Sequence, residues 1–273
     1  MFVSIILSTV LVPLLLGIVL YGVLRVFPKI DPLVALITGA MAFAIYVILE
    51  SMPSLPPISS KDKVALLIAL FTVAAIVTSA IKFNRFVTIV ILLVGALVWL
   101  GWNRLYDPEM LPRFATLLVP ILIGGWAFQK FDWQDQPGLV WPVTLLCFAI
   151  GGAVVALLGA YIGFAQMLGA FAAFAGGFAL VFYLLLLFAP QITPISLPQS
   201  ALQIVFLSMM AVLLATGLFA PEISPAALAL LGLVLFAPFL QARFGGYHSA
   251  LKPIITGVIA AIPALAAIAV ASL

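Results

Sequence analysis

The side chains of this sequence that could do chemistry are few and widely spaced. The chain has one histidine, His248, and one cysteine, Cys147, together with eight acidic and eleven basic residues. No cysteine or carboxylate stands at metal-ligand spacing beside His248, so we expect neither a metal centre nor a bis-histidine haem site. Its setting, "GGYHSALKP", predicts a solvated loop. The single cysteine rules out a disulfide within the sequence and is expected to be a small packing residue.

The motifs of the common enzyme classes do not occur either. The sequence lacks G-x-S-x-G, H-E-x-x-H and G-x-x-x-x-G-K-[ST], the signatures of hydrolases, metalloproteases and P-loop nucleotide sites. The isoelectric point is near 9.1, but the basic residues form no cluster or stripe that would bind nucleic acid. We therefore expect no enzymatic activity, no cofactor, no nucleotide site in this chain and no nucleic-acid partner.

Ionisable groups are also missing from the middle of the long apolar segments. Such groups are costly inside a membrane and usually mark catalysis or energy coupling when they occur there. The carboxylates closest to the segments, Glu50 and Glu222, both stand beside prolines. This setting favours solvated positions at helix ends or in loops.

Weakly polar side chains are what remains as a candidate site. Tyr161 and Gln166 follow each other closely, and Gln203 opens another apolar segment. In membrane helices such groups commonly form hydrogen bonds between helices. Two interpretations stay open for the three residues, interhelical hydrogen bonding and a substrate path. Gln166 is the strongest candidate, because its amide both donates and accepts and the surrounding segment is rich in glycine.

The composition requires a membrane around these residues. The chain of 273 residues is 66% hydrophobic and 7% charged, with a mean hydropathy of +1.39, whereas soluble domains contain about 25% charged residues. Many apolar segments approach the ~20 residues needed to cross a bilayer. We predict an all-α polytopic integral membrane protein with no soluble domain. Its ten predicted spans are residues 3–27, 33–49, 64–81, 86–102, 112–128, 139–158, 163–188, 201–219, 226–243 and 254–272.

The distribution of Lys and Arg between alternate loops predicts the orientation. Seven basic residues lie in the odd-numbered loops and four in the even-numbered loops. Because cytoplasmic loops carry an excess of Lys and Arg, we expect the odd loops in the cytoplasm and both termini outside. The expected location is a plasma membrane of the bacterial inner-membrane type. The odd-loop residues are Arg25, Lys29, Lys82, Arg85, Lys130, Arg243 and Lys252.

The stretch "LLGAYIGFAQMLGAFAAFAGGF" predicts a tight helix pair. Residues 139–188 would make one helix of ~75 Å, more than twice the bilayer core, so the chain must turn. We place the turn at Gly159 and Gly163. The small residues that follow recur every four positions, which predicts one face packed closely on the preceding helix. These residues are Ala165, Gly169, Ala173 and Gly177.

Further local signals mark helix ends and irregularities. Ser59 with Asp62 has the spacing of a capping box, while Asp107 and Ser224 are expected N-caps followed by proline. Mid-span prolines predict kinks, and the tryptophans are expected at the headgroup level. The prolines are Pro13, Pro120, Pro238 and Pro263, and the tryptophans are Trp99, Trp102, Trp126, Trp133 and Trp141.

We predict a single membrane domain of residues 1–273, which could also divide into two halves, 1–138 and 139–273. Two functions remain open for it. The first is a secondary permease or flippase-like carrier for a neutral, amphipathic or lipidic small molecule. It fits the number of spans and the kinked helices. The alternative is a non-catalytic membrane subunit that scaffolds or anchors a larger complex, with the bilayer and other membrane subunits as its partners. It fits the small loops and the small-residue faces.

Overall fold

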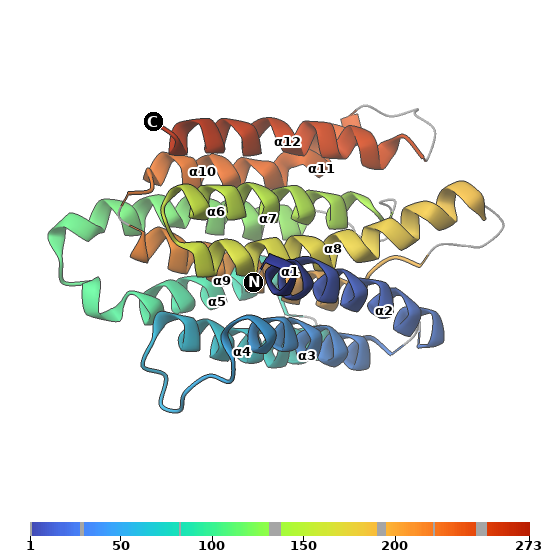
Figure 1. Cartoon of the computed structure of the whole chain (residues 1–273), viewed down its shortest axis with the longest axis horizontal. Helices are drawn as coiled ribbons and strands as arrows, with labels where there is room; N and C mark the ends of the chain where they lie inside the picture. The colour runs from blue at the N-terminus through green and yellow to red at the C-terminus, as the bar shows by residue number, and fades with distance from the viewer. Residues whose placement is uncertain are drawn as a thin grey trace.

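The computed structural model describes residues 2–27, 30–81, 83–130, 138–189, 195–220, 222–243 and 250–273, and within these ranges it contains helices and no strand. Figure 1 shows the long helices lying roughly parallel in one bundle. The elements are α1 (Phe2–Ile6), the π-helix η1 (Leu7–Leu11), α2 (Val12–Val26), α3 (Asp31–Glu50), α4 (Ser60–Ile81), α5 (Arg85–Leu100), η2 (Trp102–Arg104), η3 (Pro108–Met110), α6 (Leu111–Lys130), α7 (Val140–Leu158), α8 (Ile162–Phe188), α9 (Gln199–Phe219), α10 (Pro225–Leu233), η4 (Val234–Phe236), α11 (Ala237–Arg243) and α12 (Lys252–Ala271).

Nine helical segments of the described ranges are long and apolar enough to cross a membrane. The predicted fold class, an all-α polytopic membrane protein, is therefore confirmed. The remaining predicted span corresponds to α5, which has 16 residues and is shorter than the others. At 1.5 Å per residue α5 is ~24 Å long, less than the ~30 Å hydrocarbon core. A tenth crossing by α5 stays a prediction.

Helix α9 forms the centre of the bundle. Every residue from Ser200 to Leu218 is buried, whereas helices at the edge, such as α12, expose much of their surface to the surroundings. Helices α3 to α8 all pack against α9, so elements from both predicted halves of the chain share this core. A polar side chain on α9 therefore faces protein and not lipid.

The predicted turn between α7 and α8 is present. Gly159 follows the last residue of α7, Ala160 has a left-handed backbone with φ of 58°, and α8 begins at Ile162. The two helices pack against each other along their length, for example where a Cβ on Gly152 would lie 3.1 Å from Leu168 Cδ1. Gly163 lies inside α8 and not in the turn. The left-handed position is held by alanine, at a cost of about 1 kcal/mol.

The predicted packing of the small-residue stripe against α7 is wrong. A Cβ added to Gly169 would meet no atom of another described element within 4 Å, and Ala173 is only partly buried. Gly177 does pack tightly, but against the Leu14 backbone of α2. The reason is geometric: a four-residue step rotates by about 40° around a helix, so three steps move the stripe through about 120°. It therefore winds away from any single neighbour.

Of the three predicted helix caps, two are confirmed and one forms no side-chain bond. The capping box is confirmed, with Ser59 N donating to Asp62 Oδ2 at 3.2 Å and Asp62 N donating to Ser59 Oγ at 3.1 Å. Asp107 accepts from Glu109 N at 3.1 Å, as expected of an N-cap. Ser224 stands at an N-cap but makes no side-chain capping bond. Ala227 N donates instead to the carbonyl oxygen of Ser224 at 3.0 Å, and Pro225 has no N–H that needs an acceptor.

The expected proline kinks and the expected exposure of Trp141 have different outcomes. Helices α6 and α12 run on through Pro120 and Pro263, and a kink at either proline stays a prediction. Pro13 instead follows the π-helix η1, and Pro238 follows the 3-10 turn η4, so the helix is irregular at these two sites. Trp141 stands at the start of α7 but is buried against Phe128, with ring centroids 4.8 Å apart, so the half-exposed ring expected of an interfacial tryptophan is wrong for it.

The other tryptophans divide in two groups. Trp99, Trp102 and Trp126 lie near helix ends and are each more than a third exposed, which agrees with the expected interfacial positions. Trp133 lies outside the described residues.

Candidate functional site

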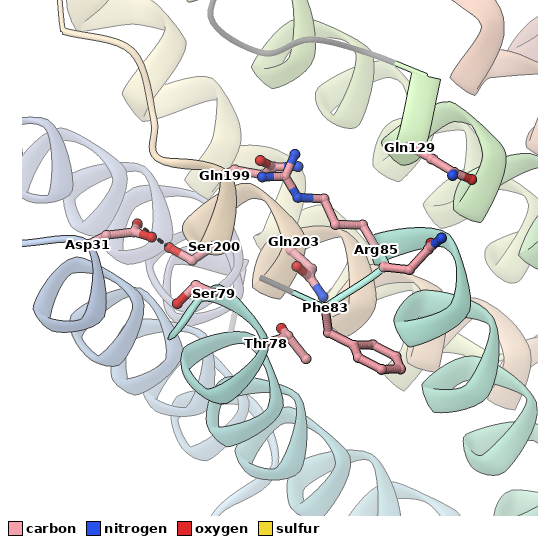
Figure 2. A pocket seen from close by; sticks show the side chains of 10 residues that line it. Asp31, Thr78, Ser79, Phe83, Arg85, Gln129, Gln199, Ser200 and Gln203 are labelled. Carbon is pink, nitrogen blue, oxygen red and sulfur yellow. Dashed lines mark hydrogen bonds between the residues drawn. The ribbon is translucent and has the colours of Figure 1, made fainter. Parts of the chain in front are cut away.

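A polar pocket lies at one end of the bundle, where five helix ends meet. Its volume is about 490 Å³. It is formed by the first residues of α3, α5 and α9 and by the last residues of α4 and α6, as Figure 2 shows. The lining residues are Asp31, Thr78, Ser79, Phe83, Asn84, Arg85, Gln129, Gln199, Ser200 and Gln203. In a chain with so few polar residues, this is a pronounced concentration.

Two glutamines of α9 supply amide groups to the pocket. Gln203 lies one turn inside the helix and is 5% exposed, and Gln199 stands four residues earlier on the same side. Within the described ranges, neither Nε2 atom has a hydrogen-bond partner, although both are buried. A buried donor without a partner costs about 1–3 kcal/mol. This cost is offset if a bound molecule supplies the missing acceptor.

Arg85 brings a positive charge to the same place. It is the first residue of α5, whose start is set by Asn84, because the side chain of Asn84 accepts from Val87 N at 3.3 Å. Figure 2 shows the Arg85 side chain extending from α5 toward the beginning of α9, where Gln199 lies. The guanidinium group carries five donors in a rigid plane and stays charged at any physiological pH.

The opposite charge comes from Asp31 at the start of α3. Ser200 Oγ donates a hydrogen bond to Asp31 Oδ1 at 2.5 Å, which joins the N-terminal ends of α3 and α9. A carboxylate is favourable in the first turn of a helix, because the N-terminal end of the helix dipole is positive. The described lining therefore contains one cationic and one anionic side chain.

Hydroxyl groups at the end of α4 complete the described lining. Thr78 Oγ1 donates to the carbonyl of Ala74 at 2.8 Å, and Ser79 Oγ donates to the carbonyl of Ile76 at 2.8 Å. Each hydroxyl uses its hydrogen within its own helix but keeps lone pairs that can accept from a ligand. This wall of the pocket differs chemically from the amide groups of α9.

Of the three residues predicted to line a substrate path, only Gln203 belongs to this pocket. Tyr161 stacks on Phe164, with ring centroids 5.0 Å apart, and both Tyr161 and Gln166 lie at the start of α8. The starts of α8 and α9 lie at opposite ends of the bundle in Figure 1. The structure therefore does not bring Tyr161 and Gln166 together with Gln203, and a path role for these two residues stays a prediction.

Sequence reasoning missed Asp31, Arg85, Gln199 and Ser200. Each stands at the end of a predicted span, where polar residues are ordinarily interpreted as loop or cap residues. One signal could have found them: alternation of the spans places the starts of α3, α5 and α9 at the same membrane face. What the sequence does not show is that these helices are neighbours in the bundle.

The opposite end of the bundle holds an ion pair that the sequence did not suggest. Lys61 Nζ lies 2.6 Å from Glu50 Oε2, and the Glu50 side chain is 16% exposed. Glu50 stands at a helix end as expected, as the last residue of α3, but the expected solvation is wrong, because its side chain is mostly covered and is paired with Lys61 of α4. A Cβ on Gly163 would lie 2.9 Å from Glu50 Oε1, so α8 also covers the pair. Glu222 is exposed in a turn, as expected.

The other reactive side chains that the structure describes form no second site. Within the described ranges, no three His, Cys, Asp or Glu residues are grouped so that they could hold a metal ion. Cys147 is half-buried in α7, with Sγ 3.8 Å from the carbonyl oxygen of Gly257. His248 lies outside the described residues. Comparison of the chain with known protein families, with curated proteins and with solved structures gives no match.

Proposed function

We propose that this protein is a secondary carrier for an amphipathic or lipidic small molecule and that it has no enzymatic activity. The observation that carries the proposal is the polar pocket at the start of α9, with two buried amide donors that lack partners in the described structure. Polar groups buried in membrane bundles commonly mark the path of a solute. Of the neutral, amphipathic and lipidic classes that the composition suggests, a solute with a polar head and an apolar body fits best.

A shallow, open apolar groove supports the choice of an amphipathic solute. It has a volume of about 300 Å³ and lies between the beginning of α7, the end of α8 and the beginning of α12. Chain alternation places these helix ends at the same end of the bundle as the polar pocket. Both a polar and an apolar binding surface are therefore available at one membrane face.

Irregular helices give further support. The helix that begins at Phe2 contains the π-helix η1 before Pro13, and the helix that begins at Pro225 contains the 3-10 turn η4 before Pro238. Broken helices free backbone carbonyls and form binding sites in many secondary transporters. Such irregular turns also allow two parts of a helix to move separately during alternating access.

The test is transport by the full chain reconstituted into liposomes. One assay follows flipping of a lipid with a fluorescent headgroup by its quenching with an impermeant reductant, and a second follows uptake of labelled amphipathic solutes. We expect transport to fall about tenfold in Gln203→Leu, because one ligand hydrogen bond to a buried amide contributes about 1–1.5 kcal/mol. Gln241→Leu is the matched control, since Gln241 is a buried amide of α11 outside the polar pocket.

Two results would contradict the carrier function. One is the absence of transport for every solute class in liposomes that contain folded protein. The other is an equal loss of transport in Gln203→Leu and Gln241→Leu, which would indicate a general effect of removing a buried amide.

A specific observation also favours the second candidate, a scaffold subunit. The face of α8 around Gly169 is open within the described structure, and small residues on such a face allow close approach of another membrane helix. If this face binds a partner subunit, Gly169→Leu should release that subunit from the native complex, as measured by the mass of the complex after mild extraction. A mass unchanged by Gly169→Leu would exclude this use of the face.

A further inference from the structure

The polar pocket presents hydrogen-bond donors to one common region. The Nε2 atoms of Gln199 and Gln203 are buried without partners in the described structure, and the whole of Gln203 is only 5% exposed. Both residues line the pocket together with the charged donor Arg85. A ligand at this position must therefore offer acceptors, and a negative charge on it would be favourable.

The beginning of α9 adds backbone donors to these side chains. The residue before the helix is Pro198, which makes no side-chain capping bond. The first N–H groups of any α-helix have no partner within the helix, and the dipole of the helix makes this end positive. Because α9 has 21 residues and its first turn lines the pocket, its end attracts an anion to the region where the two amides point.

We propose that this pocket binds a phosphate group, either as a soluble phosphate or as the headgroup of a lipid. The donors come from three sources: the guanidinium of α5, the two amides of α9 and the backbone at the start of α9. A phosphate offers three or four oxygen atoms in a tetrahedral arrangement and can accept from all three sources at once. A carboxylate has only two oxygens in one plane. The proposal rests on the same pocket as the proposed transport function and names the group that it recognises.

The carboxylate of Asp31 in the same pocket sets the position of the phosphate. Asp31 Oδ1 already accepts from Ser200, which ties this carboxylate to the α3 side of the pocket. Repulsion between like charges places a phosphate away from Asp31 and toward Arg85 and Gln203. With one carboxylate and the cationic Arg85 among the described lining residues, the pocket offers a divalent cation little net negative charge.

Binding is measured on the full chain, purified in an uncharged maltoside detergent, from the thermal unfolding followed by tryptophan fluorescence. Three probes are titrated: inorganic phosphate, dioctanoyl phosphatidic acid and dioctanoylglycerol, which has the same acyl chains without the phosphate. We expect the melting temperature to rise with at least one phosphate-bearing probe, and not with dioctanoylglycerol, because a ligand stabilises the state that binds it.

Variants of the pocket test where the phosphate binds. Arg85→Gln and Gln203→Leu should each weaken binding by about tenfold or more, since each removes a hydrogen-bond donor to a charged ligand. Gln241→Leu should bind as the parent does. If Arg85→Gln does not fold, Arg85→Lys keeps the charge but loses the planar fork, and it should give a smaller loss of affinity.

The outcomes separate the sources of the phosphate. Stabilisation by inorganic phosphate supports a soluble ligand, and stabilisation by phosphatidic acid alone supports a lipid headgroup. Equal stabilisation by dioctanoylglycerol, or none by either phosphate probe, overturns the proposal. If the parent binds phosphate and the pocket variants do not, but the parent transports no solute in liposomes, the carrier function is refuted and the phosphate site is supported. Transport without any phosphate binding refutes the site alone.

Discussion

Arg113 at the beginning of α6 holds the end of α9 through the carbonyl oxygen of Ala220, which lies 2.9 Å from Arg113 Nη1. The same side chain also donates to the carbonyls of Gly217 at 3.3 Å and Ile223 at 3.4 Å. Arg104 donates to the carbonyl of Leu218 at 2.7 Å. The last carbonyls of a helix lack partners within it, and a positive charge is favourable there. Two arginines thus stabilise the end of the buried central helix that lies opposite the pocket.

Replacing Arg113 should therefore destabilise the whole bundle. We expect Arg113→Met to lower the free energy of unfolding by about 2–3 kcal/mol, because it leaves buried carbonyls without a donor. Denaturant unfolding in mixed micelles measures this loss, and Arg113→Lys should recover part of it. If Arg113→Met unfolds like the parent, the bonds to the end of α9 contribute no net stability.

Gly177 and Gly169 form a matched pair on the same helix. A Cβ on Gly177 would lie 2.9 Å from the Leu14 carbonyl carbon and closer still to its oxygen, whereas a Cβ on Gly169 would meet nothing within 4 Å. We expect Gly177→Ala to destabilise the protein by about 1–3 kcal/mol through overpacking. Gly169→Ala should instead be neutral or stabilising by up to about 1 kcal/mol, because alanine favours helix. Thermal unfolding of both variants in one detergent is the measurement, and equal effects would contradict the observed packing of α8 on α2.

Removing the negative charge of Asp31 should strengthen phosphate binding. Asp31→Asn keeps an oxygen that accepts from Ser200 Oγ, so the junction of α3 and α9 should remain. We expect an affinity increase of roughly threefold, the size of a single charge interaction near a protein surface. The phosphate titration described above measures it, and the increase should shrink at high salt. Weaker binding in Asp31→Asn would mean that the carboxylate organises the site rather than repelling the ligand.

Transport should not depend strictly on an imposed pH gradient. The described carboxylates of the spans stand at helix ends, and Glu50 is held by Lys61, with Nζ 2.7 Å from Oε1. A proton-coupled carrier usually has a titrating carboxylate or histidine near the middle of the membrane. Uptake into liposomes with and without the gradient, in the parent and in Glu50→Gln, tests this expectation. Uptake that requires the gradient and disappears in Glu50→Gln would show that the ion pair couples transport to protons.

The predicted orientation can be tested with reporter fusions. The excess of Lys and Arg in the odd loops predicts that fusions at Leu273 and within residues 53–60 report a non-cytoplasmic position. A fusion at Lys130 should report the cytoplasm, which would place the phosphate pocket at the cytoplasmic face. A cytoplasmic signal at Leu273 would invert this map.

The membrane helices and the caps at helix ends were predictable from the sequence, because the length of an apolar segment and a capping bond both depend on residues close together in the chain. An 18-residue apolar stretch must be a membrane helix whatever surrounds it, and the capping box at Ser59 closes within three residues. The need for a turn followed from length, since one helix of residues 139–188 would exceed the bilayer, and the glycines at 159 and 163 indicated where it lies. The same reasoning identified Gln203 as a polar residue at the start of a span.

The tertiary structure alone decided which helices are neighbours. Inside a membrane every helix is apolar all round, so the pattern of hydrophobic residues does not tell which face meets protein and which meets lipid. The stripe that includes Gly169 was therefore predicted to pack on α7, whereas no described neighbour lies within 4 Å of a Cβ at Gly169 and Gly177 packs against Leu14 of α2. For the same reason, only the bundle shows that Arg85 of α5 and Asp31 of α3 lie around Gln203 of α9 and make a pocket from residues far apart in the chain.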